Sequence, residues 1–437
     1  MAKKVLIICY YWPPAGGSGV QRHLKFAKYL RDFGWEPVIY TVSNGEYPET
    51  DPSLLSEVPQ GIKIIRRPIL EPYSFYKFFS GKKKQEKITP NFFSQKNTSF
   101  FSKTAIFLRS NFFIPDARMW WIKPSVKYLN KYLTEHPVDA IISTGPPHSL
   151  HMIGMEVSKA LNIPWLSDFR DPWTNIDYFK ELTLLPNARQ KHERLEKEVL
   201  TNANTVVTVS PTWACELGEI GNRKVEVITN GFDETDFKAN TTKLDEKFTI
   251  VHPGMFSKAR NHETFWEALA EMRKENSYFA NDVKIVFYGI TDPSVNVFAE
   301  KYGLTDCLEI NSYLPHDKIV DIMASAWVLL LSVHDSKNLQ GFVPGKLFEY
   351  LAARRPILCL GPENGDSAGI ISESKAGLVS GFKDKNKLKI NLSVFYSDFI
   401  NGRTVMDSSN ISQFSRRNLT QKLAQLLDEM VQSKEAR

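Results

Sequence analysis

Short apolar runs alternate with amphipathic stretches along most of the 437-residue chain. Apolar runs of four to eight residues are typical of strands buried on both faces of a parallel sheet, and amphipathic stretches between them are typical of covering helices. In the first half the pattern predicts strands at Val5–Tyr10, Val38–Val42, Ile62–Arg66, Ala140–Ser143, Trp165–Phe169, Val206–Ser210 and Val225–Ile228. In the second half it predicts strands at Thr249–His252, Lys284–Tyr288, Glu309–Ser312, Val328–Ser332 and Ile357–Leu360.

A polar segment without periodicity, Asp233–Lys247, separates the two halves. We therefore expect two doubly wound α/β domains, residues 1–234 and 248–411, joined by a linker at 235–247. The last stretch, Ser412–Val431, predicts an amphipathic helix with Leu419, Leu423, Leu426 and Leu427 on one face. We expect this C-terminal helix, within residues 412–437, to pack back on the first domain.

A glycine-rich loop follows the first predicted strand, at Tyr11–Val20, and leads into a helix. Doubly wound sheets bind ligands at the carboxyl ends of their strands, so this loop is a candidate binding segment. Its candidates for close backbone approach are Gly16, Gly17 and Gly19. The G-x-G-x-x-G spacing of dinucleotide-binding proteins is absent, and a flexible turn between strand and helix is the alternative.

A second polar segment, Ser167–Trp173, also lies at the end of a predicted strand. It places Asp168, Arg170 and Asp171 at the carboxyl edge of the sheet. Two carboxylates three positions apart, with an arginine between them, can bind a divalent metal or one another. The alternative is an Asp–Arg pair that fixes the loop.

A third segment, Thr144–Ser149, holds His148 directly after a strand. A histidine there is suited to shuttle a proton or to hydrogen-bond a substrate hydroxyl. A helix cap made by Ser149, beside an incidental histidine, explains the segment equally well.

Residues 341–363, GFVPGKLFEYLAARRPILCLGPE, have the pattern of an anion site. A loop enters a short helix at Pro344 and Gly345, and an apolar strand follows. Free backbone N–H groups and the helix dipole favour negative charge at such a helix start. Lys346 adds a formal charge, and Glu349 lies about one turn into the helix. An ordinary helix start with a basic surface residue is the alternative.

The segment His252–Asn261 follows the first predicted strand of the second half. It contains Gly254 at the strand end, and Lys258 and Arg260 in the loop before the next helix. Two cations in such a loop can offset the charge of a phosphate group, although exposed surface residues would give the same pattern.

Taken together, these segments resemble the retaining GT-B glycosyltransferases of glycosyltransferase family 4, the group 1 transferases, in a bacterial form. Residues 341–363 resemble the donor-binding segment, and Ser167–Trp173 resembles a "DxRDPW" segment that faces the donor sugar. Ile228–Asp233 resembles the "NG-D" turn, and Ser312–His316 resembles the segment that lines the nucleobase pocket. The likeness extends over nearly the whole chain, in order.

The resemblance implies two Rossmann-like domains facing across a cleft, with acceptor on the first and nucleotide on the second. It implies that Glu349 binds the ribose, and that Lys258 and Arg260 meet the β-phosphate. The implied donor-binding residues are Glu349, Lys346, Gly345, Pro344, Val343, Gly341, Arg260, Lys258, Gly254, Tyr313 and Leu314. The implied catalytic residues are Asp168, Arg170, Asp171 and His148. Gly16, Gly17 and Gly19 would lie under the donor phosphates and against the acceptor.

One position departs from the family pattern. The family often carries a second glutamate eight residues before the first, and here that position is Gly341. Another group, such as Gln340 or a backbone N–H, would then make the corresponding contact with the donor sugar.

The resemblance implies transfer of a hexosyl group from a UDP- or GDP-linked donor to an acceptor hydroxyl, with retention and without a metal. Cell-surface polysaccharide or glycolipid synthesis is the expected setting. Two other classes stay open. A nucleotide-sugar epimerase shares the two-domain α/β architecture, and a non-catalytic nucleotide- or glycan-binding protein is conceivable because of Gly341.

The net charge of +6 is modest, but residues 73–113 hold seven Lys, one Arg, one Glu and ten Phe. Lysines beside aromatic residues suit an anionic membrane surface. An insertion that packs its Phe residues on its own domain is the alternative. Nucleic-acid binding is disfavoured because no recognised motif is present.

The apolar content of 42% is sufficient for full cores, and no run of 18 or more apolar residues is present. The four cysteines, Cys9, Cys215, Cys307 and Cys359, lie far apart and give neither metal spacing nor a disulfide framework. We therefore expect a cytoplasmic protein, peripheral on the inner face of the membrane.

Overall fold

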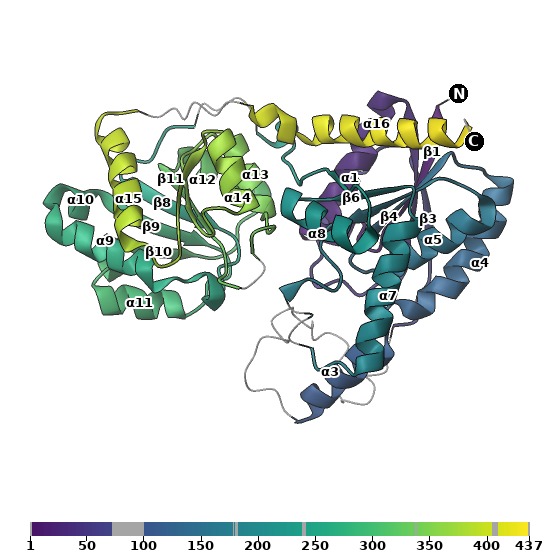
Figure 1. Ribbon diagram of the computed structural model, residues 1–437. Helices are drawn as coiled ribbons and strands as arrows, with labels where there is room; N and C mark the ends of the chain where they lie inside the picture. Colours follow the sequence, from purple (N-terminus) through teal and green to yellow (C-terminus); the bar gives the residue numbers. More distant parts are fainter. Residues whose placement is uncertain are drawn as a thin grey trace. The chain divides into compact units, whose positions relative to one another are not determined.

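The computed structural model describes residues 2–71, 100–177, 179, 182–237, 242–336, 339–403 and 410–435. The chain divides into two compact units, each described by itself (Figure 1). The first unit comprises Met1–Thr229 and Arg416–Arg437, and the second comprises Asn230–Ser415. The predicted linker at 235–247 therefore lies within the second unit.

A seven-stranded parallel sheet forms the centre of the first unit, in the order β3-β2-β1-β4-β5-β6-β7. Its strands are β1 (Lys3–Ile8), β2 (Trp35–Val42), β3 (Lys63–Arg67), β4 (Ala140–Gly145), β5 (Trp165–Phe169), β6 (Thr205–Thr208) and β7 (Glu226–Val227). The order runs outward from the central pair β1 and β4, which is the doubly wound topology. Each strand matches a predicted apolar run.

Helices cover both faces of this sheet because successive strand residues point to opposite sides. Val5, Ile7 and Cys9 face one layer, and Leu6 and Ile8 face the other. The helices of the unit are α1 (Ser18–Tyr29), α3 (Phe100–Phe112), α4 (Met119–Glu135), α5 (Ser149–Leu161), α7 (Pro186–Asn202), α8 (Pro211–Gly221) and α16 (Arg416–Glu435). Short 3₁₀ turns lie at η1 (Leu30–Phe33) and η2 (Pro52–Glu57).

The C-terminal helix α16 packs beside α1 in the first unit (Figure 1). Leu419, Leu423 and Leu427 are buried there with residues of β1 and α1, whereas Leu426 is only partly buried. The Lys3 ammonium donates to the Asp428 carboxylate at 2.7 Å, which adds a polar contact to the apolar one. The helix therefore completes one face of the first sheet although it follows the second unit in the chain.

The second unit has a six-stranded parallel sheet in the order β10-β9-β8-β11-β12-β13. Its strands are β8 (Phe248–Pro253), β9 (Val283–Tyr288), β10 (Leu308–Asn311), β11 (Val328–Ser332), β12 (Ile357–Leu360) and β13 (Gly377–Ser380). This is again the doubly wound order, now centred on β8 and β11. The strand β13 was not predicted, because its four residues include a glycine and a serine and lie at the sheet edge.

The helices of the second unit are α9 (Glu263–Glu275), α10 (Ser277–Asp282), α11 (Ser294–Tyr302), α12 (His316–Ser325), α13 (Gly345–Ala353), α14 (Asp366–Glu373) and α15 (Lys385–Ile400). Short 3₁₀ turns lie at η4 (Glu234–Asp236), η5 (Lys258–Arg260), η6 (Thr305–Cys307) and η7 (Ile411–Phe414). One core layer packs α9, α11 and α15 on the sheet, and the other packs α12, α13 and α14. The predicted class, two doubly wound α/β units, is confirmed.

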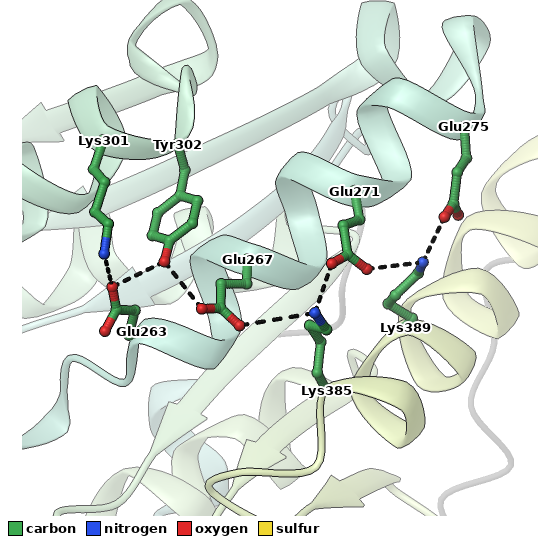
Figure 2. A network of polar contacts seen from close by, with 8 residues as sticks. All are labelled: Glu263, Glu267, Glu271, Glu275, Lys301, Tyr302, Lys385 and Lys389. Carbon is green, nitrogen blue, oxygen red and sulfur yellow. Dashed lines mark hydrogen bonds and ion pairs between the residues drawn. The ribbon is translucent and has the colours of Figure 1, made fainter.

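A network of hydrogen bonds and ion pairs between exposed and partly exposed side chains joins α9, α11 and α15 (Figure 2). Glu271 of α9 accepts from Lys385 at 2.6 Å and from Lys389 at 3.2 Å, both on α15. At the other end of α9, Glu263 and Glu267 accept from Tyr302 of α11 at 2.8 and 3.0 Å. Each exposed pair of this kind contributes little to stability, so these contacts only supplement the apolar packing that already holds the helices together.

Most of the basic aromatic segment predicted at residues 73–113 lies outside the described residues. Its last part belongs to α3, whose Asn111 side chain donates to the Thr183 carbonyl at 2.9 Å and accepts from the Leu185 N–H at 2.6 Å. Phe112 at the end of the helix is 62% exposed. Among the described residues, no helix combines the length and apolar character needed to cross a bilayer.

Candidate functional site

The strongest candidate site lies where the strand order of the second unit reverses, at the carboxyl ends of β8 and β11. The loops after these two strands leave in opposite directions, and ligands of doubly wound sheets bind in the crevice that results. The loop after β8 leads through Gly254 to η5, and the loop after β11 leads to α13. Gly254 and Arg260 from the loop after β8, and Lys346 from the start of α13, thereby come to one place.

Gly254 and Lys346 approach so closely that a side chain at position 254 would displace the lysine. A Cβ atom at Gly254 would lie 2.9 Å from the Lys346 Nζ atom. The backbone φ of Gly254 is 86°, a value that residues with a side chain rarely adopt. The backbone conformation therefore favours glycine here, and a side chain at this position would also shift Lys346.

Lys346 is held by a histidine that we did not include among the candidates. Its Nζ atom lies 3.1 Å from His252 Nε2, and His252 Nδ1 lies 2.8 Å from the Leu330 carbonyl. A neutral imidazole that donates from Nδ1 to this carbonyl offers the lone pair of Nε2 to the ammonium. Burial and the charge of Lys346 hold the pKa of His252 well below its usual range, which fits a neutral ring.

The electrostatic environment of Lys346 is that of a cation without a full counter-charge. Burial and, after it, the Arg260 charge lower the pKa of Lys346 to about 7, against a partly opposing effect of the Glu349 carboxylate. Burial also lowers the pKa of Arg260, although a guanidinium stays charged at neutral pH. An anionic ligand would supply the missing negative charge.

Arg260 and Lys258 occupy different environments although they are two residues apart. Arg260 is largely buried, its Nη1 atom lies 3.4 Å from the Met255 carbonyl, and its own carbonyl accepts from Ser332 Oγ at 2.5 Å. Lys258 is exposed at the other end of η5. Only Arg260 is therefore fixed beside Lys346.

The start of α13 supplies the remaining donor candidates. Pro344 is the N-cap, and Gly345 is exposed with open space around it. Among the described residues no side chain caps this helix start, and the Leu347 N–H already donates to the Pro344 carbonyl at 3.0 Å, so the Gly345 and Lys346 N–H groups are left for a ligand. Glu349 lies one turn further on the same helix, partly exposed.

The residues before this helix are buried. Gly341 and Val343 both lie in the interior, and the adjacent Gln340 carbonyl accepts from the Asp366 N–H at 2.7 Å. The Gln340 backbone is thus fixed by the start of α14. A substitute for the missing glutamate at Gly341 would have to come from this closely packed turn.

Tyr313 and Leu314 lie in the loop between β10 and α12. The Tyr313 side chain is 70% exposed, and Leu314 is partly buried. The loop follows an edge strand, so it lies two strands from β8 at the same carboxyl edge. An exposed aromatic ring in this place is free to stack on a flat ligand.

The corresponding edge of the first unit holds the glycine loop and Arg170. Arg170 Nη1 donates to the Gly19 carbonyl at 3.2 Å, and Nη2 donates to the Pro146 carbonyl. A Cβ atom at Gly19 would lie 2.8 Å from the same Nη1 atom. Gly16 is tied by its N–H to the Glu49 carbonyl at 2.9 Å, and Gly17 is exposed. Arg170 therefore ties three strand-end loops together.

Asp168 does not reach a surface where a substrate hydroxyl would lie. Its side chain is 2% exposed, and it accepts from Arg22 Nη2 at 2.9 Å and from Arg22 Nε at 3.0 Å. His23 Nε2 lies 3.0 Å from the same carboxylate. The Asp168 carboxylate is therefore part of a buried ion pair, and its contact with a sugar or acceptor, which the resemblance implies, stays a prediction.

Asp171 and His148 are not fully exposed surface residues either. Asp171 is only partly exposed, and burial raises the pKa of its carboxyl group. The His148 ring is 5% exposed and stacks on Trp173 with 4.5 Å between ring centroids. Burial and the nearby His151 lower its pKa, so the ring is neutral. The alternative from the sequence, a helix cap made by Ser149, differs from the structure, because the Ser149 N–H itself donates to the Asp116 carboxylate at 2.8 Å.

The partners that sequence reasoning missed, His252 and Arg22, share one signal. Each is a polar residue inside an apolar periodic stretch, where a side chain is buried and needs a partner. Nothing in the local sequence identifies that partner. Among the described residues, no group of three or more His, Cys, Asp or Glu side chains could hold a metal ion.

No protein-family model and no curated protein sequence matches the chain. Solved structures share its fold over almost the whole length. HepE of Anabaena in complex with UDP is 13% identical, with 98% of this chain and 100% of that chain covered and a TM-score of 0.64. WaaG, a glycosyltransferase involved in lipopolysaccharide biosynthesis, is 14% identical, with 97% and 99% covered and a TM-score of 0.54.

A third similar structure belongs to a different class of protein. It is from Listeria monocytogenes and is assigned as a UDP-N-acetylglucosamine 2-epimerase. It is 10% identical, with 99% of this chain and 98% of that chain covered and a TM-score of 0.54. These likenesses establish the GT-B fold of two Rossmann-like domains for this chain.

Proposed function

We propose that the protein is a glycosyltransferase that moves a sugar from a nucleotide-sugar donor to an acceptor hydroxyl. The observation that carries the proposal is the gathering of Arg260, Lys346 and the open start of α13 at the switch point of the second unit. A departing nucleoside diphosphate develops negative charge there, and fixed cations and N–H groups stabilise it. The sequence resemblance and the shared fold support the same reaction.

The donor contacts follow from the placement of each residue. Arg260 and Lys346 meet the pyrophosphate without needing a metal, while the exposed Lys258 adds longer-range attraction. Glu349 binds the ribose, and Tyr313 with Leu314 flanks the base of a UDP- or GDP-linked donor. The buried turn of Gly341 and Val343 leads into the helix start at Pro344 and supplies rigidity.

The first unit is proposed to hold the acceptor through its glycine loop, Gly16, Gly17 and Gly19. Arg170 fixes this loop, and Asp171 and His148 are the residues that we propose exchange a proton. Asp168 acts on the loop through the buried Arg22 and His23 and is a positioning residue. Retention of configuration through an oxocarbenium-like transition state is the expected course.

The acceptor is proposed to be lipid-linked or a growing surface glycan, because residues 73–113 combine lysines with phenylalanines. This places the enzyme on the cytoplasmic face of a membrane, in polysaccharide or glycolipid synthesis. Flotation with anionic liposomes measures the contact. Protein that stays at the bottom of the gradient with and without anionic lipid would contradict it.

The donor site is tested by calorimetric titration of the protein with UDP, GDP, CMP and dTDP. We expect one nucleotide to bind, and Glu349→Gln to weaken it about tenfold, the loss of one hydrogen bond to a charged group. Glu373→Gln, an exposed residue of α14, is the control and should bind like the wild type. A chain that binds none of the four would contradict the proposal.

A nucleotide-sugar epimerase is the second candidate, because one of the similar folds is assigned to that activity. Such an enzyme converts its donor without an acceptor. Incubation of the identified donor with the protein alone, followed by chromatography, separates the two candidates. An isomeric nucleotide-sugar would identify an epimerase, whereas an unchanged donor would favour transfer. Binding without any turnover would indicate a non-catalytic protein.

A further inference from the structure

We propose that His252 sets both the position and the proton content of Lys346, so that a nucleoside diphosphate binding in this site takes up one proton from solution. His252 is then a positioning residue. The inference rests on the proposed function, since the pyrophosphate is the ligand that draws the proton to the lysine.

Within the part of the chain that the structure describes, Lys346 has one well-placed acceptor, and that acceptor is uncharged. His252 Nδ1 lies 2.8 Å from the Leu330 carbonyl, which leaves Nε2 as a lone pair 3.1 Å from the Lys346 Nζ atom. The imidazole packs against two aromatic rings, because its centroid lies 4.8 Å from that of Phe256 and 6.0 Å from that of Phe287. Lys346 is therefore held inward, and no carboxylate of the described residues is in direct contact with it.

The charged and titratable groups around this pair leave the balance positive. Arg260 of η5 contributes a permanent cation, and Glu349 on α13 contributes the opposing carboxylate. Tyr350 on α13 stays a neutral phenol, because burial raises its pKa, and its hydroxyl donates to the Leu330 carbonyl at 3.3 Å. An ammonium in such surroundings loses its proton more readily than one in water.

A bound pyrophosphate reverses this balance. Its negative charge raises the pKa of Lys346, so the amine lone pair takes a proton from the buffer acid and forms a third N–H bond. The buffer acid becomes its conjugate base, and no other bond is made or broken. Affinity therefore falls as pH rises above the point where free Lys346 loses its proton. Between pH 7 and pH 8 we expect about fivefold weaker binding.

The experiment is calorimetric titration with UDP and GDP at pH 8 in HEPES, Tricine and Tris, whose ionisation enthalpies differ. The slope of the observed enthalpy against the ionisation enthalpy counts protons. The wild type should take up about 0.9 proton, given that the pKa of free Lys346 lies at about 7. Lys346→Arg, which stays charged at every pH used, should bind with no uptake.

Two histidine variants separate the role of His252 from general burial. His252→Phe keeps the ring among its aromatic neighbours and removes the acceptor, so Lys346 turns to solvent and uptake falls to near zero. His262→Phe is the matched control, because His262 is also largely buried and also has a lowered pKa, with Nε2 2.6 Å from the Val333 carbonyl. It should keep the wild-type proton count.

A second readout needs no nucleotide. Competitive acetylation of the free protein, followed peptide by peptide, should give Lys346 a pH midpoint near neutrality in the wild type and an ordinary lysine midpoint in His252→Phe. Ordinary midpoints in both proteins would overturn the inference. Binding without proton uptake, or uptake that Lys346→Arg retains, would also overturn it while leaving the proposed function intact. Absence of UDP and GDP binding would instead overturn the proposed function.

Discussion

Individual residues of the candidate site are costly for the folded protein and useful for a ligand. Lys346 is largely buried beside Arg260, where an ammonium is poorly solvated, and Gly254 has a φ of 86° directly against it. Functional sites commonly hold such unfavourable arrangements, which the rest of the fold supports. The residues that lower the stability of the fold therefore indicate where a ligand binds.

Replacing Gly254 by alanine tests this contact. The new Cβ atom would meet the Lys346 Nζ atom at 2.9 Å, so the lysine must move and nucleotide affinity should fall about tenfold. Stability should fall by about 1–2 kcal/mol because of the left-handed backbone. The control is Gly303→Ala, which has a φ of 66° and no atom within 4 Å of its added Cβ. Equal affinities of the two variants by calorimetry would disprove the contact argument.

Single elements of the fold follow from local pattern, but their partners do not. The C-terminal leucines predict one face of a helix, and α16 uses this face against β1 and α1 of the first unit. Predicted and observed strands agree in number within the first sheet, whereas the edge strand β13 escaped prediction. Periodicity identifies a buried face because solvent is excluded from it, and an edge strand lacks that signal.

Two neighbouring leucines of α16 give a matched pair for measuring this face. Leu427 is fully buried and Leu426 only partly buried. Leu427→Ala should lower the free energy of unfolding by about 2–5 kcal/mol, because it removes packed methyl groups and leaves a cavity. Leu426→Ala should cost clearly less. Urea unfolding followed by circular dichroism decides the matter, and equal losses would show that α16 packs differently.

At the scale of the whole molecule, the two doubly wound units have different tasks in the function that we propose. The first unit holds its strand-end loops with a buried ion pair, Asp168 to Arg22, and the second concentrates cations at its switch point. A substitution in one unit should therefore leave ligand binding by the other unit unchanged. This expectation separates a positioning role for Asp168 from direct contact with the donor.

Asp168→Asn should destabilise the protein by about 3–5 kcal/mol, because it leaves Arg22 as an uncompensated buried charge. Nucleotide affinity, measured by calorimetry at a temperature where the variant is folded, should stay at the wild-type value. Asp32→Asn, an exposed aspartate of the same unit that pairs with Arg417 at 3.2 Å, is the control and should cost little. A large loss of nucleotide affinity in Asp168→Asn would restore a donor-binding role.

The same pair predicts how stability depends on pH. Burial alone would raise the pKa of Asp168, but the Arg22 charge and the contact with His23 outweigh it and hold the pKa well below the usual range. A depressed pKa in the folded state contributes stability at pH above about 4 and loses it as pH falls further. The melting temperature of the wild type should therefore drop steeply below pH 4. The drop should be smaller in Asp168→Asn, and equal slopes would exclude this origin.

The sequence alone determined the alternation of strands and helices, the two-unit division and the loops at strand ends that carry polar residues. Those features depend on neighbours within a few positions, where spacing fixes which side chains share a face. Only the tertiary structure decided which polar groups meet. Arg22 and Asp168 are 146 positions apart, and His252 and Lys346 are 94 apart. Such pairs form because burial forces each group to find a partner across the fold, and local pattern does not specify which one it finds.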